Sequence, residues 1–152
     1  MIGTAGILLF RKRPAGTEVF LIHMGGPMWA KRDEGAWSIP KGEIDAFEDP
    51  LDAATREFQE EVGSPVAGDF ISLSTFRQNS TKNLSVWAVE GDIDPVTLKS
   101  NVFSMVWPPK SGRLQEYPEA DRGAWFGKSE AYAKIVKGQQ KVLDAFFAMK
   151  RT

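Results

Sequence analysis

The chain has 152 residues, with 19 lysines and arginines, 20 aspartates and glutamates, and no cysteine. This length and the 42% of hydrophobic residues suit one globular domain, residues 1–152, without room for a second catalytic domain. The balanced charge argues against binding to bulk nucleic acid or to an anionic membrane, so a small substrate is favoured. The lack of cysteine excludes disulfides, thiolate metal sites and cysteine nucleophiles.

The N-terminal residues show no sign of a targeting segment. Residues 1–10 are too short for a signal peptide and lack its charged start and its cleavage site. No apolar run approaches the roughly 20 residues that a helix needs to span a bilayer. We therefore expect a cytoplasmic protein, and the sequence predicts nothing about its oligomeric state.

Apolar runs at residues 5–10 and 19–22 predict two strands, joined by a turn at residues 14–16. The basic residues 11–13 between them are interpreted as a solvated strand end rather than as a phosphate site. Residues 37–40 predict a further short, buried strand that leads into Lys41 and Gly42.

His23 is the only histidine, so a His-based relay or a His-rich metal site is excluded and the general base must be a carboxylate. The loop at residues 25–35 is long for this chain, and such loops often line sites. Two interpretations stay open: Trp29 stacks on a base while Lys31 or Arg32 meets a phosphate, or the loop is solvated and Trp29 packs on the body.

A helix is predicted within residues 42–63, the stretch on which the interpretation of the chain depends. Asp49 can cap the first turn, Pro50 fits the first helical position, and Gly63 is a typical stop. An apolar stripe at spacings of three and four residues is formed by Leu51, Ala54, Phe58 and Val62.

Glu57, Glu60 and Glu61 fall within roughly 100° of one another on a neighbouring face of this helix. Glutamates at this spacing repel one another, so the cluster gains stability only if cations lie against it. Mg²⁺ is the natural candidate, because it binds carboxylate oxygens, waters and substrate phosphates. The alternative is an ordinary solvated face, since glutamate is a good helix former.

After the helix, residues 70–77 and 84–89 predict two strands with a hairpin turn between them. Trp87, in the second strand, is interpreted as a core residue rather than as a platform for a base. Residues 94–123 are expected to be irregular, and a stretch of this length is usually functional or mobile.

At the C-terminal end, residues 124–126 predict one more short strand. Apolar residues from Ser129 onward then predict a helix that breaks near Gly138.

The spacing within residues 42–63 resembles the Nudix box, the signature of Nudix hydrolases. Gly42 is followed by five residues and Glu48, then by seven residues and the run REFQEEVG at residues 56–63. The chain departs from the usual pattern at Ser64 and Phe58, where aliphatic residues are expected. Neither position would touch a metal, so these departures concern packing alone.

This resemblance implies an α/β/α sandwich around a mixed sheet, with the box as loop, helix and loop. It also implies hydrolysis of a nucleoside diphosphate linked to another moiety, with Mg²⁺ or Mn²⁺. The strand at residues 5–10, the segment at 40–42 and the pair Trp125-Phe126 stand where Nudix hydrolases have corresponding elements.

Roles for individual residues follow from the same resemblance. Glu57 and Glu60 correspond to metal ligands, Glu61 to a ligand or a base, and the Gly42 carbonyl to a further ligand. Arg56 is expected to orient the glutamates through charge-assisted hydrogen bonds.

Two other carboxylates have implied roles. Glu48 is expected to support a metal or the loop. Glu119 stands before Trp125 at a distance similar to that of the late glutamate in diadenosine tetraphosphate hydrolases of the family. Glu116 competes for that role, and a solvated loop acid is the alternative for both.

The leading hypothesis is a Mg²⁺-dependent pyrophosphohydrolase acting on a small nucleotide, with a dinucleoside polyphosphate as one candidate. A non-catalytic nucleotide-binding module is the first alternative, although such relatives typically lose box glutamates that this chain keeps. Hydrolysis of RNA ends or of inositol pyrophosphates is the second, and the near-neutral charge argues against it.

Overall fold

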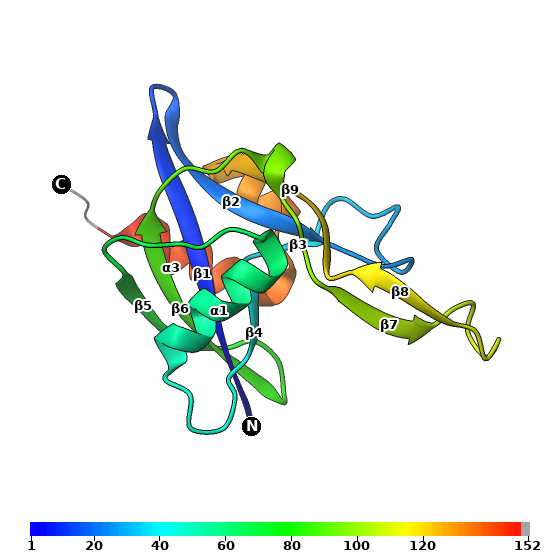
Figure 1. The fold of residues 1–152 in the computed structure, drawn as a ribbon. Helices are drawn as coiled ribbons and strands as arrows, with labels where there is room; N and C mark the ends of the chain where they lie inside the picture. The colour runs from blue at the N-terminus through cyan, green and yellow to red at the C-terminus, as the bar shows by residue number, and fades with distance from the viewer. Residues whose placement is uncertain (150–152) are drawn as a thin grey trace.

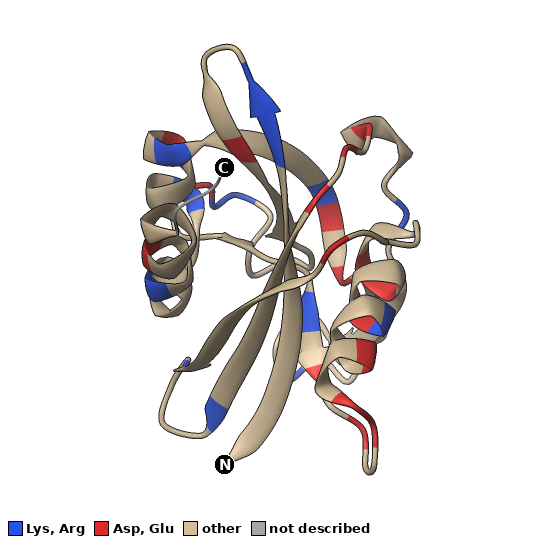
Figure 2. Ribbon diagram, turned by 90° about the vertical axis from the view of Figure 1, so that its left-hand side faces the viewer, with Lys and Arg blue, Asp and Glu red and all other residues tan. Residues whose placement is uncertain are grey.

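The computed structural model describes residues 1–149, which form a seven-stranded mixed sheet covered by helices on both faces (Figure 1). Helix α1 (Pro50–Val62) lies on one face. Helices α2 (Lys128–Lys134) and α3 (Gln140–Ala148) lie on the other, as the turned view in Figure 2 shows. The α/β/α sandwich and the mixed sheet are thereby confirmed.

The sheet is mixed because β1 is antiparallel to β2 and parallel to β6. Its main path runs through β3 (Trp37–Ser38), β2 (Gly16–Met24), β1 (Ile2–Arg13), β6 (Lys82–Glu90) and β5 (Ile71–Arg77). Two strands lie off this path: β4 (Lys41–Glu43) pairs with β1, and β9 (Ala120–Gly127) pairs with β2.

Strand β1 is apolar throughout its centre because both of its faces are buried. Ile7 and Leu9 contribute to the core layer under α1, whereas Leu8 and Phe10 contribute to the layer under α3. Trp87 is half-buried and packs against the α1 layer, in agreement with its interpretation as a packing residue.

Helix α1 begins and ends where the sequence predicts. The Asp49 carboxylate accepts from the backbone N–H of Leu51 at 2.9 Å, and Gly63 ends the helix with a φ of 86°. After α2, a 3-10 turn at Lys137–Gln139 separates it from α3, so the predicted break near Gly138 is confirmed. No helix within residues 1–149 is long and apolar enough to cross a membrane.

The expectation of an irregular stretch at residues 94–123 is wrong. After a 3-10 turn at Pro95–Thr97, β7 (Val102–Val106) and β8 (Leu114–Pro118) form an antiparallel hairpin, and β9 already begins at Ala120. Ser104 interrupts the apolar residues of β7, and β8 carries the polar pair Gln115 and Glu116, so neither strand is marked by a continuous apolar run.

The loop after β2 agrees with the interpretation in which Trp29 packs on the body of the protein. Trp29 is half-buried and packs against the core layer under α3, with the Arg32 guanidinium 5.4 Å from the centre of its ring. Arg11 pairs with Glu18 and Asp92, in agreement with a solvated strand end at residues 11–13.

Candidate active site

The site begins where β4 meets α1. A Cβ atom placed on Gly42 would lie 1.9 Å from Glu57 Oε2, so a side chain at this position would displace the carboxylate. Glu61, one turn further along α1, accepts from the backbone N–H of Lys41 at 3.4 Å. A glycine in β4 therefore allows the helix carboxylates to lie directly against the strand backbone.

These groups line a cavity of about 310 Å³ between β4, α1 and the segments that flank the β7–β8 hairpin. Gly42, Glu57, Glu61 and Glu119 are the predicted residues that the structure brings together there. The lining is completed by Thr4, Lys41, Glu43, Lys82 and Asn101.

Burial dominates the electrostatics of this cavity. It raises the pKa of Glu57 to about 7, with the nearby Glu60 adding to the effect. Burial, followed by repulsion from Glu57, raises the pKa of Glu61 to about 8. Glu119 is more exposed, and partial desolvation of its carboxylate also raises its pKa. Lys41 is half-buried beside them, and the loss of solvent around its ammonium group lowers its pKa. The cavity thus holds more acid than its own cations neutralise.

Arg56 links the cavity to carboxylates outside it, and its Nη1 atom lies 3.6 Å from Glu57 Oε1. Its Nε and Nη2 atoms donate to the two Glu48 oxygens at 2.9 and 3.0 Å, and Nη1 donates to both Glu60 oxygens at 3.2 Å. The contact with Arg56 lowers the pKa of Glu48 to about 2. Glu48 also accepts from the backbone N–H of Asp45, so its contacts are with the loop and Arg56.

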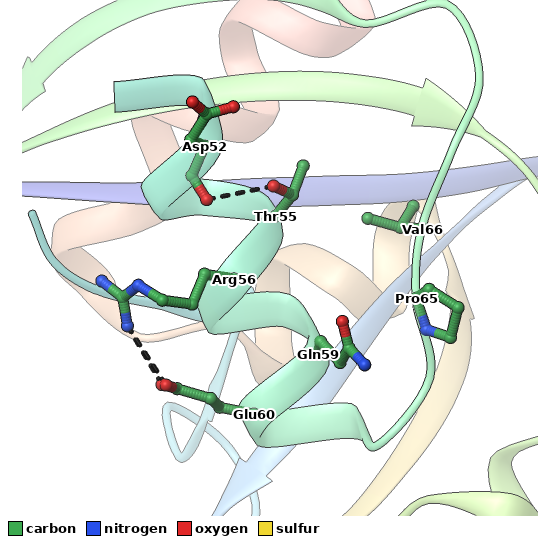
Figure 3. Close-up of a pocket in the computed structure, with 7 residues that line it drawn as sticks. All are labelled: Asp52, Thr55, Arg56, Gln59, Glu60, Pro65 and Val66. Atoms are coloured by element: carbon green, nitrogen blue, oxygen red, sulfur yellow. Dashed lines mark hydrogen bonds and ion pairs between the residues drawn. The ribbon is translucent and has the colours of Figure 1, made fainter. Parts of the chain in front are cut away.

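Glu60 does not line the cavity, although it lies close enough to Glu57 to help raise the pKa of that residue. With Arg56 it lines a neighbouring pocket on the outer side of α1, where Figure 3 shows the two side chains directed toward each other. Figure 2 shows acidic residues along α1 and the loop before it. Glu116, the competitor of Glu119, is exposed on β8 and does not line the cavity.

Sequence reasoning missed several lining residues. Lys41 precedes Gly42 directly, so its position next to the box was a usable signal. Thr4, Lys82 and Asn101 come from the ends of β1, β6 and the segment before β7, and only the pairing of these strands places them at the cavity.

Comparison with known proteins identifies the fold family. The family model for the NUDIX domain matches residues 2–146. This chain belongs to the NUDIX domain family.

Among curated relatives, this NUDIX chain is 33% identical over 113 residues to the 8-oxo-(d)GTP phosphatase of Mycolicibacterium smegmatis, covering 70% of the chain and 32% of that protein. It is 50% identical over 40 residues to the RNA pyrophosphohydrolase of Gluconacetobacter diazotrophicus, covering 26% of the chain and 22% of that protein. The matches thus span about a third or less of these relatives.

Solved NUDIX structures share the fold. The C. elegans Ap4A hydrolase binary complex has a TM-score of 0.63 at 20% identity, covering 97% of this chain and 96% of that one. The NUDIX domain of Shewanella oneidensis NrtR, complexed with ADP ribose, has a TM-score of 0.67 at 12% identity, with coverages of 97% and 86%.

The NUDIX box side chains fit a divalent cation by their chemistry. Glu57 Oε2 is buried and, within residues 1–149, lacks a hydrogen-bond partner, which is costly for a carboxylate oxygen. No three carboxylate or imidazole side chains in that range converge as a ready-made metal shell. Glu60, the remaining glutamate of the box, forms an ion pair with Arg56 at 3.2 Å.

Proposed function

We propose that this NUDIX protein is a divalent-cation-dependent pyrophosphohydrolase that cleaves a nucleoside diphosphate linked to another moiety. The observation that carries the proposal is the orphaned oxygen of Glu57, buried against Gly42 and sharing a cavity with Glu61. Acids whose pKa is raised by burial ionise at neutral pH only beside a compensating positive charge, and a bound cation would supply that charge. Such perturbed acids in a cavity are typical of functional sites.

Gly42, Glu57, Glu60 and Glu61 are the proposed holders of Mg²⁺ or Mn²⁺, through the Gly42 carbonyl and the three carboxylates. Binding in this way requires Glu60 to turn from Arg56 toward the cavity, while Arg56 keeps its two bonds to Glu48. When bound, the cation supplies neutralisation of phosphate charge and lowers the pKa of the attacking water.

The proton of the attacking water goes to a carboxylate in this proposal. Glu61 and Glu119 both line the cavity and both have raised pKa values, and a higher pKa makes a carboxylate a stronger base. His23 is engaged elsewhere: its Nδ1 lies 2.9 Å from Asp121 Oδ1, and its Nε2 lies 2.6 Å from the Arg32 carbonyl. Lys41 and Lys82 place positive charge in the same cavity, where they can attract substrate phosphates.

A small nucleotide is the proposed partner, with a dinucleoside polyphosphate as the first candidate substrate. Support comes from the shared fold with the Ap4A hydrolase and from Glu119 at the cavity. The second candidates are an oxidised nucleoside triphosphate and the 5′ end of RNA, because the curated relatives include proteins named for those activities. A cytoplasmic location remains a prediction.

A nucleotide panel tests the proposal. We expect Mg²⁺-dependent product formation from at least one of diadenosine tetraphosphate, 8-oxo-dGTP, ADP-ribose and 5′-triphosphorylated RNA. Phosphate release is read after a coupled phosphatase for diadenosine tetraphosphate and ADP-ribose, and after a coupled pyrophosphatase for the two triphosphates. The Glu57→Gln variant is the matched control for contaminating activity. If the wild-type protein binds nucleotides with Mg²⁺ and releases nothing, the non-catalytic binding module is correct instead.

The site of attack separates the dinucleoside hypothesis from the others. In ¹⁸O-labelled water, diadenosine tetraphosphate is expected to yield ATP and AMP with the label in one product. Two molecules of ADP, or turnover only of a nucleoside diphosphate sugar, would reject the dinucleoside substrate and leave the pyrophosphohydrolase proposal standing.

A further inference from the structure

The β7–β8 hairpin stands apart from the rest of the fold. Within residues 1–149 its strands pair only with each other, and the hairpin projects away from the main sheet (Figure 1). An isolated two-stranded hairpin is only marginally stable in water. Its root, however, is tied to the end of α1: Lys99 N donates to the Val62 carbonyl and Asn101 N to the Glu60 carbonyl, both at 2.8 Å.

The hairpin ladder continues one step inward, to the glutamate cavity. Val102 pairs with Pro118, and at the next position Glu119 N donates to the Asn101 carbonyl at 2.9 Å. Asn101 and Glu119 both line the cavity. Side chains alternate between the two faces of a strand pair, and residues directly opposite share a face.

Phe103 and Tyr117 are therefore on the hairpin face that leads out of the cavity. They pair directly across the ladder, and their ring centres lie 6.2 Å apart with the ring planes inclined by 42°. Both side chains are half-buried. The Phe103 ring also covers Gly26, where a Cβ would lie 3.0 Å from ring atom Cζ. We call this pair the aromatic face.

The opposite face of the same hairpin carries aliphatic side chains and is turned away from the aromatic face. Val102, Val106 and Leu114 are exposed there, with 54%, 43% and 70% of their surface accessible. Val106 and Leu114 form a cross-strand pair, as Phe103 and Tyr117 do. This pair offers a control that leaves the aromatic face intact.

We propose that the aromatic face binds the nucleobase of the substrate whose phosphates lie in the glutamate cavity. A strand rises about 3.3 Å per residue, so Tyr117 lies roughly 7 Å along the chain from Glu119. A sugar between phosphate and base bridges such a separation. Stacking on aromatic rings accepts any base, so weak discrimination among bases is expected. This inference rests on the proposed function and adds the subsite for the base.

The test compares Phe103→Ala/Tyr117→Ala with Val106→Ala/Leu114→Ala. For each panel nucleotide that the wild-type protein hydrolyses, the KM for that nucleotide is measured. The inhibition constant of tripolyphosphate, which has no base, is measured at the same Mg²⁺ concentration. If no nucleotide is hydrolysed, dissociation constants for diadenosine tetraphosphate and tripolyphosphate are measured by calorimetry. If the proposed function is wrong, the wild-type protein shows no turnover. If the inference is wrong, the aromatic variant binds the nucleotide as tightly as the wild-type protein does.

We expect the aromatic variant to bind nucleotide about tenfold to hundredfold more weakly, with kcat at saturation and tripolyphosphate affinity within about twofold of wild type. The control variant should match wild type in all three values. Equal weakening for nucleotide and tripolyphosphate would overturn the proposal, because the hairpin would then act through the cavity. A wild-type affinity no higher for nucleotide than for tripolyphosphate, or a dimer that the aromatic variant dissociates, would overturn it as well.

Discussion

Helix α1 and the β7–β8 hairpin meet at the same cavity, yet they are held in place in different ways. The helix has side-chain and glycine caps, and it buries Ala53, Ala54, Phe58 and Val62 against the sheet. The hairpin is tied at its root by backbone hydrogen bonds, and its side chains are at most half-buried. The carboxylates that need a fixed geometry thus stand on the rigidly packed element.

The difference also extends to charge. Glu57 and Glu61 are half-buried among like charges, an arrangement that weakens the helix unless its apolar side compensates. The end of the hairpin ladder brings one charged residue, Glu119, and the neutral Asn101 to the cavity. Packing under α1 therefore compensates for the repulsion among the carboxylates, whereas substitutions in the hairpin leave the core packing intact.

The largest expected effect comes from removing that packing. Phe58→Ala should lower the free energy of unfolding by about 3–5 kcal/mol, because it opens a cavity in a fully buried layer. Phe103→Ala, the matched change on the hairpin, should cost about 1 kcal/mol or less. Urea unfolding measures both. If Phe58→Ala does not fold, Phe58→Leu should still show the larger loss, and equal losses would contradict the comparison.

The second effect concerns turnover. Glu57→Gln and Glu60→Gln should each reduce kcat by at least about a hundredfold with the fold retained, because a neutral amide is a poor ligand for Mg²⁺. Glu116→Gln, on the exposed side of the hairpin, is the control and should leave kcat unchanged. Near-normal kcat and Mg²⁺ dependence in the Glu60→Gln enzyme would remove Glu60 from the proposed ligand set.

How far the sequence predicts the structure differs between the same two regions. For α1, the cap at Asp49, the stop at Gly63 and the apolar stripe are local signals, and the structure confirms all three. For the hairpin, local signals are weak: Ser104 interrupts the apolar residues of β7, β8 is largely polar, and the strands pair with each other rather than with the main sheet.

The site shows the same division. Spacing along one helix was enough to group Glu57 with Glu61. It could not reveal that Arg56 holds Glu60 on the outer side of α1, since that depends on side-chain conformation. Nor could it place Lys82 and Asn101, because they reach the cavity only through pairing between distant strands.

A third prediction uses the raised pKa values of Glu57 and Glu61, about 7 and 8 against an ordinary value of 4.5. The folded state then binds more protons than the unfolded state between about pH 4.5 and pH 8, so stability falls as the pH rises through this window. In EDTA, the melting temperature should decrease from pH 5 to pH 8.

Millimolar Mg²⁺ should reverse this decrease, because a ligand that binds only the native state stabilises it. The gain should be largest at pH 8, where the carboxylates are ionised, and absent from a Glu57→Gln, Glu60→Gln double variant. A Mg²⁺ response that persists in the double variant would place the cation elsewhere on the protein.

The smallest predicted effect tests whether local capping also positions the site. Asp49→Ala removes the side-chain acceptor for the first turn of α1 and should lower the free energy of unfolding by about 0.5–2 kcal/mol. Asp49→Asn retains an acceptor oxygen and should lower the free energy of unfolding by only a few tenths of a kcal/mol. Comparing the two variants therefore isolates the contribution of the hydrogen bond. Because Phe58 and Val62 anchor the far end of the helix, kcat should change less than about twofold in either variant. A larger loss of kcat with a small loss of stability would show that the first turn, and not the packed apolar side, sets the position of Glu57.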